Sequence, residues 1–142
     1  MPLPQIAIAY AVTAVVFLGL DAIWLGAMAD RLYRPAIGHL MAPSFALAPA
    51  VIFYVLYVAG IVFFAVAPAQ GMRRPVLAAL GLGALLGLLA YATYDLTNQA
   101  TLKDWPWRVT LADLAWGSFV TGVSAAAASA LAPWVYGWLA KD

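Results

Sequence analysis

The chain has 142 residues, is 66% hydrophobic and only 9% charged, and carries a net charge of +1. A soluble domain has about 25% charged residues, so this chain lacks the side chains that a water-facing surface requires. The small net charge excludes a general attraction to nucleic acid. The absence of cysteine excludes disulfides and thiolate chemistry, and a single histidine excludes haem ligation by two histidines of one chain. These properties indicate an integral membrane protein.

Four apolar segments are long enough to cross a bilayer, whose hydrocarbon core needs roughly 20 helical residues. We predict an all-α integral membrane protein, a compact bundle of four transmembrane helices at about 5–27, 45–66, 75–98 and 109–131, forming one domain over residues 1–142. The first segment ends in a pattern typical of signal-peptide cleavage sites. It is longer than a signal's apolar core and Asp21 interrupts it, so we interpret it as a helix.

The longest connection is the segment 28–44, in which Pro35 and Gly38 are expected to prevent a long helix. We expect it to lie at the headgroup level, although a loop crossing the surface fits equally well. His39 is interpreted as an interfacial residue rather than a catalytic base. Ser44 is a candidate N-cap for the second helix.

Pro75 suits the first position of the third helix, and Pro133 is expected to end the fourth. An even number of spans places both termini on the same side of the membrane. Four basic residues on one side against three on the other do not decide the orientation. The pair Arg73-Arg74 in a short turn favours cytoplasmic termini.

Three carboxylates interrupt the apolar segments: Asp21, Asp95 and Asp113. Each costs roughly 2.5–3.5 kcal/mol at the centre of a membrane helix. Successive helices run in opposite directions, and the distance of each residue from its helix end, at about 1.5 Å per residue, places all three in the same leaflet. Tyr54 lies at a similar depth. We therefore expect the three acids and this tyrosine to converge.

Helical spacing also predicts a packing seam, a line of close contact between the third and the fourth helix. Small residues recur along one face of the third and the fourth helix: Ala79, Gly83 and Gly87, then Gly117, Thr121, Ala125 and Ser129. Small residues let membrane helices approach closely, so these stripes are expected to pack against each other. Polar residues continue the stripe of the third helix, which predicts a polar pocket where the seam opens.

The predicted ligand-binding residues are acidic, aromatic or uncharged polar side chains from all four helices: Asp21, Trp24, Tyr54, Tyr91, Tyr94, Asp95, Thr97, Asn98, Asp113 and Trp116. Their oxygens suit a hard cation and the indole rings suit an organic cation. A structural network is the alternative, with Asp21 or Asp113 paired with a loop arginine, or Asp113 at a helix N-terminus. We predict no resident metal or cofactor.

Three stretches carry a resemblance to a known family: Tyr91–Leu102 (YATYDLTNQATL), Leu20–Leu25 (LDAIWL) and Asp113–Gly117 (DLAWG). With them, and with Phe53, Tyr54, Tyr57 and Gly60, nearly the whole chain resembles the bacterial family of membrane proteins called domain of unknown function 2177. The resemblance implies a compact four-helix protein of the bacterial inner membrane and supplies no activity. The quartet DAIW also recurs as DLAW, either as an inverted repeat of the transporter type or by coincidence.

The first functional hypothesis is a protein that binds or translocates a small amphipathic molecule, a lipid headgroup or a cation. Four helices rarely enclose a pathway alone, so translocation would require a homo-oligomer. An accessory or structural subunit of a larger membrane complex is the alternative, and a lipid-modifying enzyme is a third. Membrane lipids are the expected partners in every case.

Overall fold

The computed structural model describes residues 1–141, and within them every element of secondary structure is helical, with four helices long and apolar enough to cross a membrane. The helices follow one another in the order α1 (Leu3–Met28), a π-helical turn (Ala29–Tyr33), α2 (Arg34–Ile37), a 3₁₀ turn (Gly38–Leu40), α3 (Leu47–Ile61), a second π-helical turn (Val62–Val66), α4 (Ala67–Ala69), α5 (Pro75–Thr101) and α6 (Trp107–Leu139). The predicted membrane bundle is confirmed.

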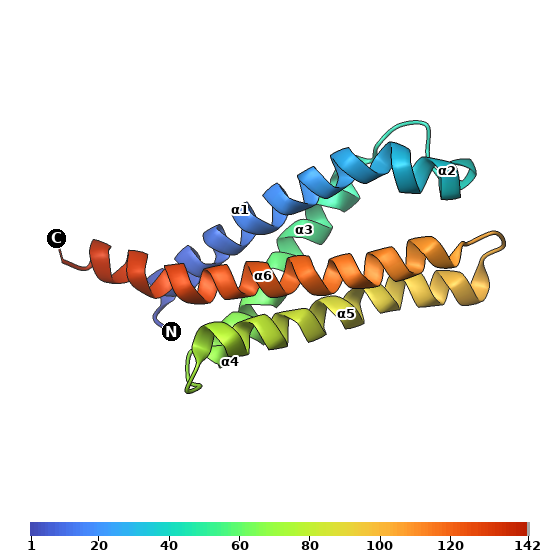
Figure 1. Ribbon diagram of the computed structural model, residues 1–142. Helices are drawn as coiled ribbons and strands as arrows, with labels where there is room; N and C mark the ends of the chain where they lie inside the picture. The colour runs from blue at the N-terminus through green and yellow to red at the C-terminus, as the bar shows by residue number, and fades with distance from the viewer. Residues whose placement is uncertain (142) are drawn as a thin grey trace.

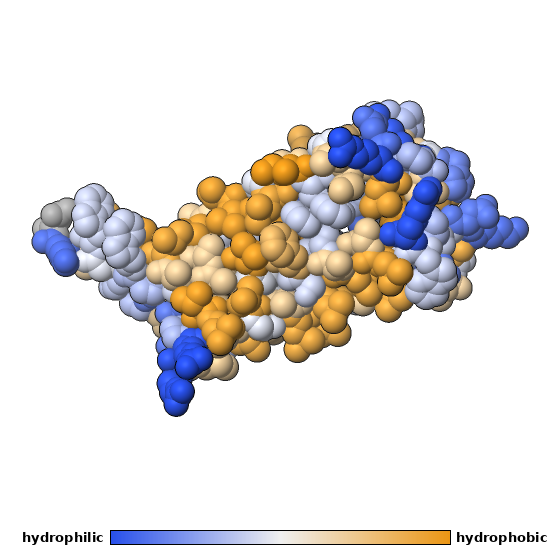
Figure 2. All heavy atoms as spheres, viewed as in Figure 1, coloured by the Kyte–Doolittle hydropathy of each residue, from blue (hydrophilic) through white to orange (hydrophobic). Residues whose placement is uncertain are grey.

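The helices form an elongated bundle that is open toward one end. α5 and α6 lie side by side along their length, whereas α1 leans on α6 near the termini and diverges from it toward α2 (Figure 1). Both termini lie at one end, and α2 and the turn between α5 and α6 lie at the other. Hydrophilic residues gather at the two ends and hydrophobic residues cover the middle of the visible face (Figure 2). This band is what a bilayer core about 30 Å thick would cover.

The seam between α5 and α6 is made by the small residues that the spacing predicted. A Cβ atom built on Gly83 would lie 2.8 Å from the Cβ of Ala125 and 2.9 Å from the carbonyl oxygen of Thr121. A Cβ on Gly87 would overlap the carbonyl oxygen of Gly117. The two backbones are therefore close enough that only glycine fits at these positions, and the predicted seam is confirmed.

Apolar packing is concentrated in the half of the bundle that holds the termini. Its buried members are aliphatic side chains and one phenylalanine: Ala9, Phe17, Ile61, Val62, Ala65, Val66, Ala69, Ala79, Val120, Ala125, Ala128 and Ala132. A second, smaller cluster joins Ile37 of α2 to Trp105, in the turn before α6, and to Val109 in the first turn of α6. The three buried carboxylates, those of Asp21, Asp95 and Asp113, lie between these two clusters along the helices.

The predicted connection 28–44 is instead helical as far as Leu40, which corrects the expectation that Pro35 and Gly38 would break it. Pro35 stands in the first turn of α2, where its missing N–H leaves no hydrogen bond unmade. The extension is held by the contact of Ile37 with the start of α6. Ser44 does not cap the next helix: α3 begins at Leu47 without a side-chain cap.

The fourth helix does not end before Pro133 but continues to Leu139. A proline inside a helix has no N–H for the carbonyl oxygen four residues earlier, which here belongs to Ser129. The side-chain amide of Gln70 donates to this carbonyl oxygen at 3.4 Å and to the Ser129 hydroxyl at 2.8 Å. The amide thus supplies the donor that Pro133 lacks, as unpaired backbone groups in a bilayer require.

Replacing Gln70 by alanine is expected to lower the free energy of unfolding by about 1 kcal/mol, because the Ser129 carbonyl loses its donor. In a Pro133→Ala background the backbone N–H of residue 133 can donate to the Ser129 carbonyl. Gln70→Ala should therefore lower the free energy of unfolding clearly less in that background. A double-mutant cycle of unfolding in detergent micelles measures the difference. Equal costs in both backgrounds would show that Gln70 does not compensate for the proline.

Candidate ligand-binding site

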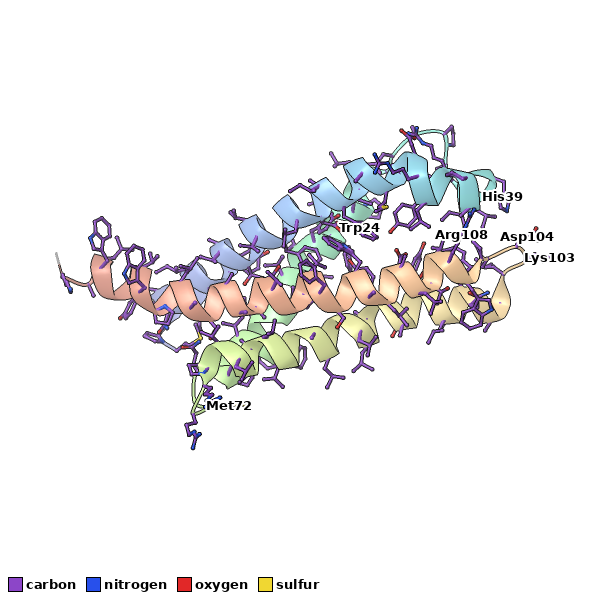
Figure 3. The ribbon with its side chains drawn as sticks, viewed as in Figure 1. Trp24, His39, Met72, Lys103, Asp104 and Arg108 are labelled. Atoms are coloured by element: carbon purple, nitrogen blue, oxygen red, sulfur yellow. The ribbon has the colours of Figure 1, made fainter. Side chains whose placement is uncertain are left out.

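A cavity of about 340 Å³ lies between α1, α3, α5 and α6, on the side of the apolar core that faces α2. Seven of its ten lining residues are aromatic, and the whole set is Asp21, Trp24, Leu25, Tyr33, Phe53, Tyr54, Ala90, Tyr91, Tyr94 and Trp116. Trp24 extends from α1 into the space between α1 and α6 (Figure 3). The volume falls in the range of roughly 300–1,000 Å³ that is usual for small-molecule sites.

Asp21 of α1 is the carboxylate that lines the cavity, and it is 7% exposed. The hydroxyl of Tyr54 donates to its Oδ2 at 2.5 Å, and the indole N–H of Trp116 donates to its Oδ1 at 3.2 Å. Two donors from two other helices hold the carboxylate in one orientation. They leave its negative charge uncompensated, because both donors are neutral.

Asp113 of α6 is held from the opposite side, by Tyr33 of the π-helical turn. The Tyr33 hydroxyl donates to Oδ1 of Asp113 and accepts the indole N–H of Trp24 at 2.8 Å. Since the contact of Ile37 with α6 holds the α1 extension in place, the packing of α2 brings Tyr33 to the acid.

The two Asp-x-x-Trp quartets face each other across α1 and α6. Their indole rings stack, with centroids 4.5 Å apart and an interplanar angle of 8°. Trp116 bonds directly to Asp21 of the other quartet, and Trp24 reaches Asp113 through the Tyr33 hydroxyl. The repetition in the sequence therefore corresponds to a reciprocal arrangement in space. It also means that one face of each indole is covered by the other.

Asp95 of α5 is fully buried, and within residues 1–141 no N–H or O–H group donates to either of its oxygens. The carboxyl group nearest to it in the helix register is that of Asp113: Gly117 of α6 packs against the ring of Tyr91 of α5, and one turn farther along each antiparallel helix stand Asp95 and Asp113. Asp95 and Asp113 do not line the cavity themselves. Tyr33 connects the cavity to Asp113, and Asp113 connects it to Asp95.

None of the three acids Asp21, Asp95 and Asp113 is part of an ion pair within residues 1–141. The one salt bridge there joins Arg34 to Asp30 at 2.5 Å on the exposed surface. Asp113 lies six residues after the first residue of α6, beyond the turn in which a carboxylate stabilises a helix N-terminus. Pairing with a loop arginine and capping are therefore wrong for Asp21 and Asp113, whereas the hydrogen bonds of both acids to side chains of other elements agree with the wider alternative of a structural polar network.

The structure brings together eight of the ten predicted site residues. Six of them line the cavity, namely Asp21, Trp24, Tyr54, Tyr91, Tyr94 and Trp116, while Asp95 and Asp113 lie behind it. Thr97 and Asn98 do not line it. Thr97 is exposed and its hydroxyl donates to backbone carbonyls of its own helix, those of Thr93 and Tyr94.

Four lining residues were not predicted: Leu25, Tyr33, Phe53 and Ala90. Tyr33 is the important one, because it joins the cavity to Asp113. At about 3.6 residues per turn, an uninterrupted helix would place Leu32, three turns after Asp21, on the cavity face. A π-helical turn adds one residue, so Tyr33 takes that position instead. The aromatic neighbour Phe53 could have been found, since it stands beside Tyr54 in the family stretch of the sequence.

Comparison with known proteins gives one family. No curated protein and no solved structure matches the chain. Residues 6–130 match the family described as "Predicted membrane protein (DUF2177)", and this stretch contains every residue that lines the cavity and both buried acids behind it. The chain belongs to this family of membrane proteins.

Proposed function

We propose that the protein binds a small amphipathic organic cation, an amine or quaternary ammonium group attached to an apolar body, in the cavity beside Asp21. The observation that carries this proposal is the composition of the lining. It has seven aromatic residues and one carboxylate, and no lysine, arginine or histidine is among the lining residues that the described chain provides. A buried negative charge without a basic partner attracts a positive ligand.

The aromatic lining suits the rest of such a ligand. Aromatic faces attract a cation by about 0.5–2 kcal/mol each, with the larger values in sites that exclude water. Tyr54, Tyr91 and Tyr94 line the cavity from α3 and α5, opposite the stacked indoles of α1 and α6. The hydroxyl of Tyr91 has no hydrogen-bond partner in residues 1–141, which leaves it available to a ligand. A lipid headgroup that carries an ammonium group has this chemistry as well.

Binding is better supported than translocation. The packed apolar core fills the bundle between the cavity and the end that holds the termini, so nothing supports a path across a single chain. The accessory-subunit alternative loses its main argument, because the small-residue stripes of α5 and α6 are used against each other inside the protein.

We further propose a bacterial inner-membrane location, with cytoplasmic termini. The family resemblance supports the membrane, and the Arg73-Arg74 pair in the short turn before α5 supports the orientation. A cysteine replacing Gly71 should react with a membrane-impermeant thiol reagent in opened but not in intact spheroplasts; reaction in intact ones would reverse the assignment.

The binding test compares three probes of similar shape: benzyltrimethylammonium, its uncharged carbon isostere neopentylbenzene, and benzenesulfonate. Calorimetry on the protein in lipid nanodiscs should show the cation binding at least about tenfold more tightly than the isostere, a difference of about 1.4 kcal/mol, with no binding of the anion. Asp21→Asn should remove that preference, whereas Asp30→Asn, at the exposed ion pair, should preserve it. Equal affinity for the cation and the isostere, or no binding of the cation, would contradict the proposal.

A further inference from the structure

Asp95 occupies an unfavourable position for an ionised group. Its side chain is fully buried in a membrane helix, and both of its oxygens lack a donor within residues 1–141. A polar group buried without a hydrogen bond is costly, and an isolated charge costs far more. The neighbouring carboxyl of Asp113 adds a second negative group rather than a compensating one.

Two carboxyl groups in contact cannot both be ionised unless a positive species lies between them. The titratable groups that face the pair from the surrounding elements are Tyr33 from the π-helical turn, Asp21 from α1, and Tyr91 and Tyr94 from α5. None of them is basic. Arg31, Lys103 and Arg108 at this end of the bundle are exposed. The pair must therefore bind a proton or a small cation.

A proton fits better than a metal ion. Ca²⁺ takes about six to eight oxygen ligands and Mg²⁺ about six in an octahedral arrangement. Within the described residues no group of three or more histidine, cysteine, aspartate or glutamate side chains is placed to hold a metal. One proton between the two carboxyl groups gives Asp95 the hydrogen bond that it otherwise lacks, and it needs no further ligand.

We propose that Asp95 and Asp113 form a proton-binding site that shares one proton, and that an organic cation entering the cavity displaces this proton. The second half of the statement rests on the proposed function of the cavity. One positive charge enters beside Asp21 as one proton leaves the pair for water, so the total charge of the site is unchanged. Tyr33 lies between the two sites and donates to Asp113, the member of the pair nearest the cavity.

Coupling of this kind is reciprocal: the cation weakens proton binding, and protonation weakens cation binding. The Asp95–Asp113 site would thereby set the pH range in which the cavity accepts its ligand. A quaternary ammonium probe has no titratable proton, so any proton that appears on binding comes from the protein.

Infrared spectroscopy of the protein in nanodiscs tests both halves of the proposal, because a protonated carboxyl group has a carbonyl band that an ionised one lacks. At neutral pH the wild type should show one such band, Asp95→Asn should lose it, and the surface control Asp30→Asn should retain it. Adding benzyltrimethylammonium should abolish the band in the wild type and release about one proton per bound cation into weakly buffered solution.

The possible failures can be told apart. Absence of the band in the wild type, or its persistence in Asp95→Asn, would overturn the proton site and leave the binding function untouched. A band that survives while calorimetry shows the cation bound would overturn the coupling alone. If calorimetry shows no binding, the proposed function fails and the coupling fails with it.

Discussion

Substitution of Gly87 by alanine should lower the free energy of unfolding by about 3 kcal/mol, the largest stability effect expected for so small a change. The added methyl group would overlap the carbonyl oxygen of Gly117 and lie 2.7 Å from the hydroxyl oxygen of Thr121. A backbone carbonyl cannot move aside as a flexible side chain can, so α5 and α6 would have to separate. Denaturant unfolding in detergent micelles measures the loss.

Gly81 of the same helix provides the matched control. A Cβ atom at this position meets nothing within 4 Å, so Gly81→Ala should be neutral or slightly stabilising. The opposite response of two glycines six residues apart would show that the seam, and not helix propensity, determines the effect. Similar small changes for both variants would mean that α5 and α6 are not in close backbone contact.

Two aspartates of the same leaflet should respond with opposite sign when replaced by asparagine. Asp21→Asn should cost about 2 kcal/mol, because its carboxylate accepts from both Tyr54 and Trp116 and an asparagine amide group would turn N–H toward one of these donors. Asp95→Asn should instead stabilise the protein by about 1 kcal/mol. The new amide is neutral and can donate to Asp113 at any pH, whereas the wild-type pair must bind a proton on folding before Asp95 gains a hydrogen bond.

Thermal unfolding at neutral pH compares the two variants with wild type. Asp30→Asn is again the control, with almost no effect expected for an exposed ion pair. A stability loss of similar size for Asp95→Asn and Asp21→Asn would show that both acids are structural. Asp95 would then contribute to stability, and there would be no sign of a function for which the protein gives up stability at this position.

The sequence was informative where composition and helical spacing act locally. The transmembrane helices follow from hydropathy, and the α5–α6 seam follows from glycine and alanine at steps of four. The position of each acid along its helix was sufficient to predict that Asp21, Asp95 and Asp113 lie at one depth. Successive helices cross the membrane in opposite directions, so the distance of a residue from its helix end gives its depth.

Tertiary compensation explains what the sequence could not show. Pro133 in the sequence predicts a helix end, and only the spatial proximity of Gln70 explains why α6 continues. Pro35 in the sequence predicts an interruption of the helix, but the contact of Ile37 with Trp105 and Val109 keeps the extension of α1 helical. Both cases involve residues more than 50 positions apart, which local patterns do not connect.

The most important of the four unpredicted lining residues, Tyr33, was missed for a related reason. Tyr33 lies in a segment whose composition predicted an interfacial loop, and its position on the cavity face depends on a π-helical turn. Thr97 was included because it flanks Asp95 on a helical projection, yet its hydroxyl is satisfied by its own helix and faces outward. Spacing therefore found the acids but not the tyrosine that links them to the cavity.

The most direct measurement uses the absence of cysteine from the sequence. A cysteine replacing Ala90, which lines the cavity, can be compared with one replacing its neighbour Leu89, which faces outward and is 58% exposed on the apolar surface. Only a thiolate in contact with water reacts with a methanethiosulfonate. The two reagents are the cationic trimethylammonium-ethyl and the anionic sulfonatoethyl forms.

A hydrated cavity that attracts cations predicts that Ala90→Cys reacts at least about tenfold faster with the cationic reagent, and that benzyltrimethylammonium slows this reaction. Leu89→Cys, facing lipid, should react with neither reagent. If Ala90→Cys is as inert as Leu89→Cys, or reacts with both reagents at the same rate, the cavity is not a cation-binding site.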